Sequence, residues 1–257
     1  REFNSSMILA TTQEITAITA VNGAAGTPDD LIDYTFDTTY SSDTVGATFA
    51  LNCVCSDTVY IGIAGHNIGS LGGTITINNH GTDDILSYVP IDNRPLMFEI
   101  PARSGSDITI TVTKASNGNQ IIISHIASGQ TTDFTSVTNN GQIMTKDYDA
   151  GYALAPMNRG RKSRAILNQS AAPTATLIKT ISQKVKLTVK NLARDFVAVE
   201  LLDYQLFWTE NSFFIQNDND PQQSFMGMQF IPATPKASGS TRSLLDVSYS
   251  LVAYNGL

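Results

Sequence analysis

Short runs in which hydrophobic and polar residues alternate recur along this chain, and they predict an all-β protein. Residues 108–113 show the pattern most clearly, with an isoleucine or valine at every second position and threonine between them. In residues 59–64 both alternating sets are apolar or small, which indicates a strand at least partly covered on both faces. About eight such segments, separated by turn residues at about ten-residue spacing, lie before residue 135 and predict a jelly-roll-like β-sandwich.

The second half of the chain repeats the same kind of pattern and predicts a second β-sandwich. We expect strands at residues 175–181, 184–190, 196–202, 204–208, 213–216, 224–231 and 244–253. A short helix within residues 191–202 is an alternative, but Phe196, Val197 and Val199 favour a strand. We therefore predict two sandwich domains, at residues 8–135 and 151–257, joined by a polar connector at 136–150. Residues 1–7 resemble a cloning remnant that ends at a natural start methionine.

The distribution of charge supports a division near residue 140. The formal net charge is −7, and only 15% of the residues are charged. Residues 1–140 hold 4 Lys and Arg against 14 Asp and Glu, whereas the remainder holds 12 against 9. An acidic first half argues against nucleic acid as the main partner, because phosphate binding needs clustered cations. It also predicts that copies of the chain pack acidic face against basic face.

Cysteine usage argues against a disulfide-stabilised protein, and hydropathy argues against a membrane-spanning one. Cys53 and Cys55 are two apart and lack other cysteines to pair with, so we expect free, core-facing thiols in a reducing compartment. The apolar runs are far shorter than the ~20 residues that a membrane-spanning helix needs, which argues against membrane insertion.

His66 and Asn67 are the most tempting candidates for chemistry, because they stand on a glycine-rich loop between two predicted strands. Neither an orienting carboxylate nor a nucleophile accompanies His66 in the sequence, so catalysis is not indicated. Either both side chains hydrogen-bond the backbone of the loop, which we favour, or they contact a ligand. The glycines permit tight turning and a close approach of the backbone to another segment. The loop is not a phosphate cradle, because a strand and not a helix follows it.

Acidic residues and a basic run supply the remaining candidates. Asp29, Asp30, Asp33 and Asp37 cluster in one loop region, but their spacing matches no EF-hand, so we expect solvated loop acids. Paired carboxylates for glycoside hydrolysis do not stand out either.

The dense basic run consists of Arg159, Arg161, Lys162 and Arg164. It is either a solvated surface or a patch that docks against an acidic neighbour, such as the first domain of another copy. Nucleic acid is the third alternative, and the lack of interleaved stacking aromatics argues against it. We expect Trp208 to belong to the core rather than to form a platform for a sugar.

The run Y-I-G-I-A-G-H-N-I-G-S-L-G-G-T-I-T-I, residues 60–77, resembles a loop pattern of galactose-binding-like jelly-roll domains in structural proteins of tailed bacteriophages. Residues 213–218 and 244–254 are similar, more weakly, to the closing strands of phage tail modules. The resemblance implies a class of protein and no reaction. We expect no cofactor; the alternative that the resemblance implies is a structural calcium ion, because galactose-binding-like folds often hold one.

From these observations we expect a non-enzymatic structural component of a tailed-phage virion, in the tail or tail tip, which contributes to host adsorption. It would be made in the host cytoplasm, contact other virion proteins and form a trimer or hexamer. The alternative is a carbohydrate-binding module that recognises cell-surface glycans. A polysaccharide depolymerase is the third hypothesis, and it lacks a recognisable catalytic set.

Overall fold

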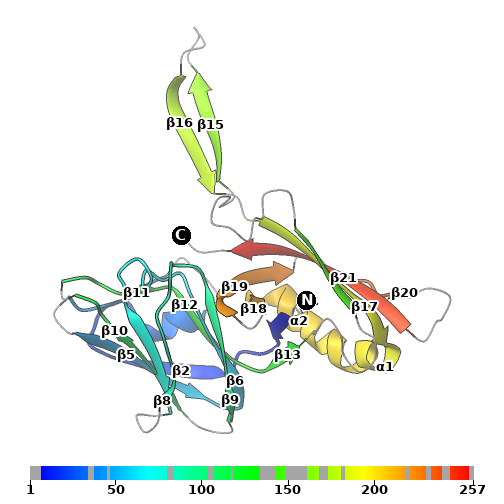
Figure 1. The fold of residues 1–257 in the computed structure, drawn as a ribbon, viewed down its shortest axis with the longest axis horizontal. Helices are drawn as coiled ribbons and strands as arrows, with labels where there is room; N and C mark the ends of the chain where they lie inside the picture. The colour runs from blue at the N-terminus through cyan, green and yellow to red at the C-terminus, as the bar shows by residue number, and fades with distance from the viewer. Residues whose placement is uncertain are drawn as a thin grey trace, which may run out of the picture.

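The computed structural model describes residues 7–33, 38–44, 47–79, 84–103, 107–116, 118–133, 143–148, 161–167, 173–180, 183–217, 220–229, 233–238 and 244–254. These residues are mostly β-strands, which confirms the predicted all-β class (Figure 1). The strands are β1 (Met7–Ala10), β2 (Ile15–Val21), β3 (Gly23–Ala25), β4 (Tyr40–Ser42), β5 (Thr48–Cys55), β6 (Thr58–Ala64), β7 (Thr74–Asn78), β8 (Asp84–Tyr88), β9 (Leu96–Arg103), β10 (Ile108–Thr113), β11 (Ile122–Ile123), β12 (His125–Gly129), β13 (Thr131–Asp133), β14 (Ile143–Tyr148), β15 (Arg161–Leu167), β16 (Pro173–Thr180), β17 (Gln183–Ala193), β18 (Phe213–Asn217), β19 (Asp220–Gln229), β20 (Lys236–Ala237) and β21 (Leu244–Tyr254).

Two antiparallel sheets from the first half pack face to face. One has five strands in the order β2-β5-β10-β7-β8, and the other has three in the order β12-β6-β9. A small sheet, β11-β4-β3, and the 3-10 helix η1 (Pro28–Ile32) lie beside them. The alternating isoleucines and valines fill the space between the two larger sheets, and Phe49, Leu51, Ile110 and Phe98 are fully or almost fully buried there. This arrangement is the β-sandwich that the period-two pattern predicts.

The three-stranded sheet is buried on both faces. On β6, Ile61 and Ile63 point into the sandwich, whereas Tyr60 and Ala64 belong to a second hydrophobic core. The sequence prediction that residues 59–64 are covered on both sides is therefore confirmed. The second core exists because the C-terminal half lays another sheet over the outer face of the three-stranded one.

That large sheet has the order β13-β1-β18-β19-β21-β17-β14, with β20 paired to β21. It combines both ends of the chain, since β1 and β13 from the first half pair with each other and β1 also pairs with β18. Phe214 of β18 faces the three-stranded sheet and stacks on His125 at 5.9 Å. The neighbouring Phe213 stacks on Trp208, which lies on the opposite side of β18, at 5.3 Å.

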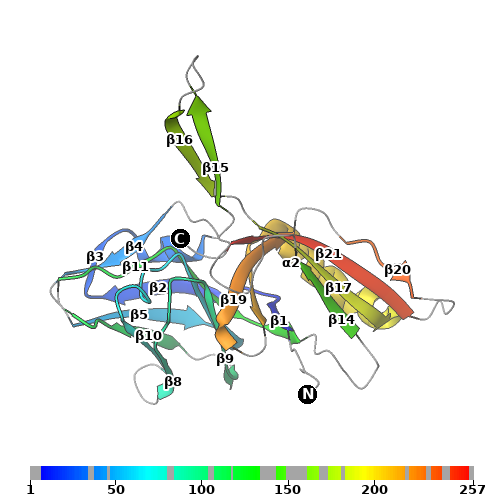
Figure 2. The same ribbon diagram turned by 45° about the horizontal axis from the view of Figure 1, so that its top comes forward.

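A helical segment at residues 194–210 covers this opposite face (Figures 1 and 2). It consists of α1 (Arg194–Phe196), the π-helical turn η2 (Val197–Leu201) and α2 (Leu202–Glu210). The strands expected at 196–202 and 204–208 are therefore wrong. The physical reason is that this segment carries apolar residues on both of its sides, so neither the helical nor the strand period is clean.

Trp208 is completely buried, as predicted, and its indole N–H donates a hydrogen bond to the carbonyl oxygen of Ala10 at 2.7 Å. From one side to the other, the molecule is layered as five-stranded sheet, three-stranded sheet, large sheet and helix. The two sandwich-like packings thus share the three-stranded sheet. Strand β14 lies within residues 136–150, where the sequence predicts a connector. The domain boundaries themselves stay a prediction.

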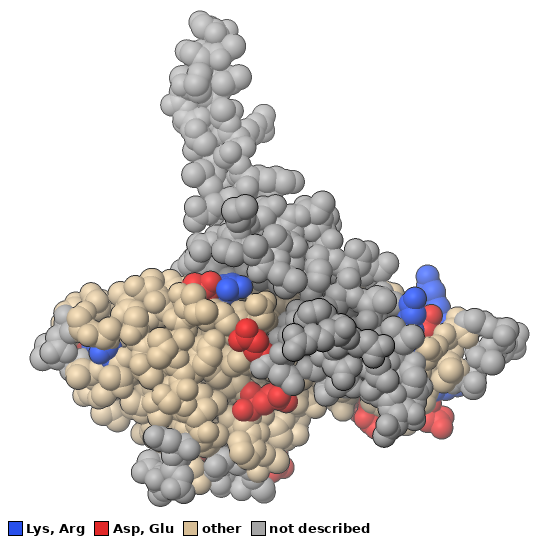
Figure 3. Space-filling view, in the orientation of Figure 1, with Lys and Arg blue, Asp and Glu red and all other residues tan. Residues whose placement is uncertain are grey.

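Strands β15 and β16 form a hairpin that stands away from these layers (Figures 1 and 2). On the face shown in Figure 3, the described surface of the sandwich carries few charged side chains. None of the described helices is long and apolar enough to cross a membrane.

Candidate functional site

Two loops meet at one end of the sandwich: residues 65–73, between β6 and β7, and residues 89–95, between β8 and β9. We call them the paired loops. Gly65 and Gly72 have φ values of 62° and 63°, which glycine adopts without strain. A Cβ atom on Gly69 would lie 2.1 Å from the carbonyl oxygen of Asp92, so the two backbones touch there. The close approach predicted for the glycine-rich loop is thus confirmed, and its neighbour is the second loop.

His66 fastens the first loop to the second. Its Nδ1 accepts a hydrogen bond from the backbone N–H of Ile68 at 3.3 Å, which places the ring proton on Nε2. Nε2 then donates to the carbonyl oxygen of Arg94 at 2.8 Å. The side chain is buried, and burial lowers its pKa to about 4. Because both ring nitrogens are engaged by backbone, the neutral ring acts as a bracket between the loops.

Asn67 fastens the same loop to the segment before β12. Its side-chain oxygen accepts from the backbone N–H of Ile122, and its side-chain amide donates to the carbonyl oxygen of Gln120, both at 2.9 Å. The expectation that His66 and Asn67 hydrogen-bond backbone groups is confirmed. A ligand contact by either residue stays untested.

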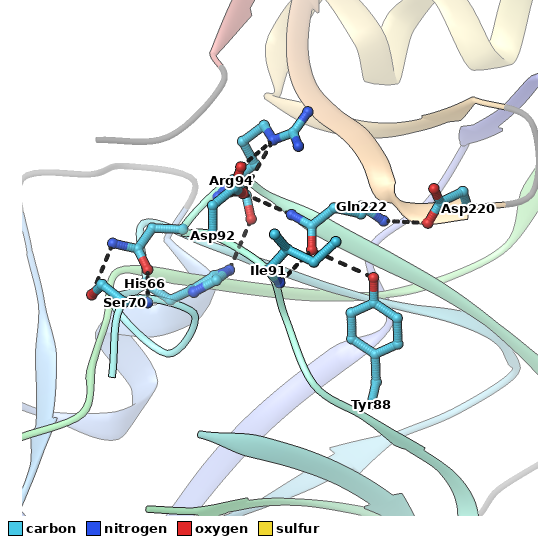
Figure 4. Close-up of polar contacts among 9 residues, drawn as sticks. His66, Ser70, Tyr88, Ile91, Asp92, Arg94, Asp220 and Gln222 are labelled. Carbon is cyan, nitrogen blue, oxygen red and sulfur yellow. Dashed lines mark hydrogen bonds and ion pairs between the residues drawn. The ribbon is translucent and has the colours of Figure 1, made fainter. Parts of the chain in front are cut away.

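The outer rim of the paired loops carries polar side chains that are partly exposed (Figure 4). Asn93 accepts a hydrogen bond from the backbone N–H of Ser70 at 2.9 Å, and its amide group donates to the Ser70 hydroxyl at 3.2 Å. Asp92 accepts from the Nε–H of Arg94 at 2.8 and 3.1 Å. Since Arg94 uses Nε for both contacts, the terminal amino groups of its guanidinium extend beyond Asp92 (Figure 4). Ile91, in the same loop, is 81% exposed.

Gln222 of β19 connects this rim to the large sheet. Its amide donates to Asp92 at 2.7 Å, and its oxygen accepts from the backbone N–H of Ile91 at 3.0 Å and, more weakly, from the Tyr88 hydroxyl at 3.4 Å. Asp220 accepts from the backbone N–H of Gln222 at 2.9 Å (Figure 4). Gln222 is only 3% exposed, so its hydrogen bonds fix the second loop from the buried side. Sequence reasoning missed it, because a glutamine 130 residues from its partner leaves no local signal.

The predicted docking patch lies elsewhere. Arg159 is outside the described residues, whereas Arg161, Lys162 and Arg164 belong to β15 of the hairpin. Figure 1 shows this hairpin standing apart from the end of the sandwich. The proposed role of these residues in docking stays a prediction.

Two of the candidate loop acids, Asp29 and Asp33, have hydrogen-bond partners within the chain. Asp29 accepts from the backbone N–H of Ile18 at 2.8 Å, and Asp33 accepts from the Thr38 hydroxyl at 3.2 Å. Asp37 lies outside the described residues. Within the part of the chain that the structure describes, no three or more His, Cys, Asp or Glu residues gather as metal ligands would. A structural calcium ion therefore stays an expectation from the family resemblance.

Both cysteines are free and buried, as predicted. Burial raises the pKa of the Cys53 thiol above its usual range and that of Cys55 to about 11, so neither is an activated nucleophile.

No protein-family model matches the chain, and neither does any curated protein sequence. Among solved structures, the chain is similar to the CBM32 of AlyQ in complex with 4,5-unsaturated mannuronic acid, with 22% identity and a TM-score of 0.37. That match covers 46% of this chain and 97% of the module. A pectin-binding carbohydrate-binding module matches with 16% identity and a TM-score of 0.36, over 46% of this chain and 93% of that one.

A tail fiber protein from an E. coli phage is aligned over 99% of this chain and 40% of its own length, with 7% identity and a TM-score of 0.23. With TM-scores this low, we draw no functional conclusion from these likenesses.

Proposed function

We propose that this protein binds carbohydrate without catalysis and that the rim of the paired loops is its binding site. The observation that carries the proposal is the fixed geometry of Asp92, Asn93 and Arg94 beside Ser70. Sugar hydroxyls both donate and accept hydrogen bonds. Planar amide, carboxylate and guanidinium groups can each form two hydrogen bonds at once, to two adjacent hydroxyls of a sugar.

Rigidity makes such a small site effective. Binding loses less conformational entropy when side chains already hold their bound orientation. Here His66 and Gln222, both buried, lock the two loops from opposite sides. Exposed Ile91 supplies an apolar surface next to the polar groups, which suits the C–H face of a sugar ring.

The same geometry argues against the third hypothesis, a depolymerase. His66 is held neutral with both nitrogens occupied, so it cannot serve as a general base without leaving its position. The proposal is therefore recognition, not turnover.

The test is affinity electrophoresis of the purified chain through gels that contain single polysaccharides, followed by titration calorimetry with oligosaccharides of any that retard it. Pectin, alginate and chitosan are the first probes, because the similar solved structures include a pectin-binding module, a truncated AlyQ with CBM32 and alginate lyase domains, and a chitosan-binding module. Arg94→Ala and Asn93→Ala should each weaken binding at least about tenfold, the loss of one or two hydrogen bonds in a charged or polar pair. Arg194→Ala, on the helix, is the matched control, and it should bind as the parent does.

Two outcomes would overturn the proposal. In one, the parent chain passes every gel unretarded across a broad panel that includes host-surface glycans. In the other, a glycan binds but Arg94→Ala and Asn93→Ala retain full affinity, which would move the site away from the paired loops. Release of reducing ends from a bound glycan would restore the enzyme hypothesis.

A structural role in the virion of a tailed phage is the second candidate. It is favoured by the sequence resemblance of residues 60–77 and by the hairpin β15–β16, which stands away from the body as an assembly arm does (Figure 2). In this role the chain would contact other virion proteins and form trimers or hexamers, and carbohydrate binding would serve host adsorption. Light scattering on a sizing column tests it: a closed oligomer is expected, and a monomer at every salt concentration would contradict it.

A further inference from the structure

The helical segment 194–210 is apolar on two sides. Its inner side buries Val197, Leu201 and Trp208 against the large sheet. Its outer side presents Val199, Leu202 and Leu206, which are 68%, 50% and 62% exposed. Their spacing of three and four residues places them in one stripe along the helix. A surface helix normally has polar side chains on its solvent side, so this exposed apolar stripe indicates a partner that covers it.

The charged residues around this stripe indicate the kind of surface that would bind there. Asp195, Glu200, Asp203 and Glu210 are exposed on the segment, and Arg194 is its single cation. We call the stripe together with these acids the outer helix face. With a net charge of −3, it fits a surface that combines apolar residues with several cations and no acids.

The hairpin β15–β16 has that composition. It contains Arg161, Lys162, Arg164 and Lys179 and no acidic residue, and it also carries the apolar residues Ile166, Leu167, Leu177 and Ile178. Its two strands pair with each other and with none of the other described strands. A two-stranded hairpin on its own is at best marginally stable in water, so this one gains from a partner surface.

The register of the hairpin adds a second reason. Lys162 is paired directly with Lys179. Like charges on opposed residues of an antiparallel pair destabilise it, and an acidic neighbour would relieve the repulsion. The hairpin points away from the helix of its own chain in both ribbon views (Figures 1 and 2), so the two surfaces do not meet within one copy.

We propose that the hairpin β15–β16 of one copy docks on the outer helix face of a second copy. Each chain then has one hairpin to give and one helix face to receive, so the contact is head-to-tail. Repetition of such a contact closes into a ring when the rotation allows it and otherwise forms a filament. This places the acidic partner of the basic run on the helix, and not on the first sandwich.

The experiment measures absolute mass by multi-angle light scattering at low and high salt. The full chain should associate at low salt and dissociate as ionic strength rises, because the contact is partly electrostatic. Two variants each disable one half of the contact: Lys162→Gln with Arg164→Gln in the hairpin, and Leu202→Ser with Leu206→Ser on the helix. Each should be monomeric alone. Val21→Ser, which removes an exposed valine from the sandwich, is the control and should associate as the parent does.

Mixing the two variants gives the decisive result. The intact hairpin of one fits the intact helix face of the other, so an equimolar mixture should form a complex of two chains and no larger species. Both substitutions combined in one chain should give a monomer. Unchanged far-ultraviolet circular dichroism would show that each variant is folded.

Three outcomes would overturn the proposal. The first is a parent chain that stays monomeric at about 100 µM and low salt. The second is an oligomer whose mass either variant leaves unchanged. The third is a mixture that stays monomeric. Association only after addition of heparin or nucleic acid would instead identify the hairpin as an arm for polyanions.

Discussion

Gly62 is where the large sheet rests on the three-stranded sheet, and its replacement by alanine tests the layered packing. A Cβ atom at this position would lie 2.4, 2.5 and 2.7 Å from three ring carbons of Phe214. Carbon atoms in contact are normally about 3.5–4.0 Å apart, so the ring or the strand must shift by about 1 Å. The ring is fully buried and stacks on His125 with an interplanar angle of 9°, which leaves it little room to move.

Overpacking of this kind costs about 1–3 kcal/mol. Alanine also lowers the conformational entropy of the unfolded chain, which can stabilise a fold by about 0.4–1 kcal/mol. This gain requires a native site that accepts the methyl group without strain, and the site at Gly62 does not. We therefore expect Gly62→Ala to lower the free energy of unfolding by about 1–3 kcal/mol. In a Phe214→Leu background the methyl group meets no ring, and the same substitution should cost less than about 0.5 kcal/mol. The coupling between the two positions should thus exceed about 0.5 kcal/mol.

Equilibrium urea unfolding measures these values. Trp208 is the single tryptophan, and it lies against Phe213 on the other side of the same strand, so its fluorescence reports on the strand that Gly62 contacts. Circular dichroism should give the same midpoint if the layers unfold together. A Gly62→Ala variant as stable as the parent, or a cost that is the same with and without the Phe214 ring, would refute the predicted clash between the methyl group and the ring.

Three further predictions concern buried groups. Burial lowers the pKa of both His66 and His125 to about 4 from the 6.5 of an unfolded chain, so protonation favours the unfolded state. The free energy of unfolding should therefore be constant above pH 6.5. Between pH 6.5 and 4 it should fall by up to about 1.4 kcal/mol per pH unit for each histidine ring. Urea midpoints that do not move over this range would contradict this prediction. Trp208→Phe leaves a buried carbonyl of β1 without its donor and should cost about 1–3 kcal/mol in thermal or urea unfolding, whereas a neutral result would mean that the indole hydrogen bond contributes nothing. Cys53 and Cys55 should react with a thiol reagent only in denaturant, so that rapid labelling of the native chain would refute their placement in the core.

The sequence predicted the sandwich well because several of its strands, such as β5, β7 and β10, carry a local, period-two signal. The two-sided burial of β6, the free buried cysteines, the core position of Trp208 and the backbone contacts of the His66 loop all follow from local patterns. A local pattern predicts that one face of a strand is buried, but it does not identify the residues that cover that face. Such patterns could not show that the outer face of β6 meets Phe214.

The misassigned helix and the missed Gln222 have a common physical origin. Phe196, Val197 and Val199 favour a strand locally, yet the segment is helical because Val197 and Trp208 pack on the large sheet. Tertiary packing overrides propensity in such a segment. Gln222 likewise acquires its partners only when β19 reaches the paired loops. The sequence therefore predicts the glycine-rich loop with His66, but it does not predict the polar rim formed above that loop.

Strand β1 has a consequence for the order in which the molecule is made. Met7 and its neighbours pair with residues 215–217, far along the chain. At a synthesis rate of about 5–20 residues per second, the first strand leaves the ribosome roughly 10–40 seconds before β18 exists. During that interval the sandwich can close, but the outward-facing Tyr60 and Met97 have no cover, and one edge of β1 stays open to pairing with other chains. The nascent protein is thus most vulnerable to aggregation late in its synthesis. Conditions that slow translation near the C-terminal strands should lower its yield, even though the finished fold is unchanged.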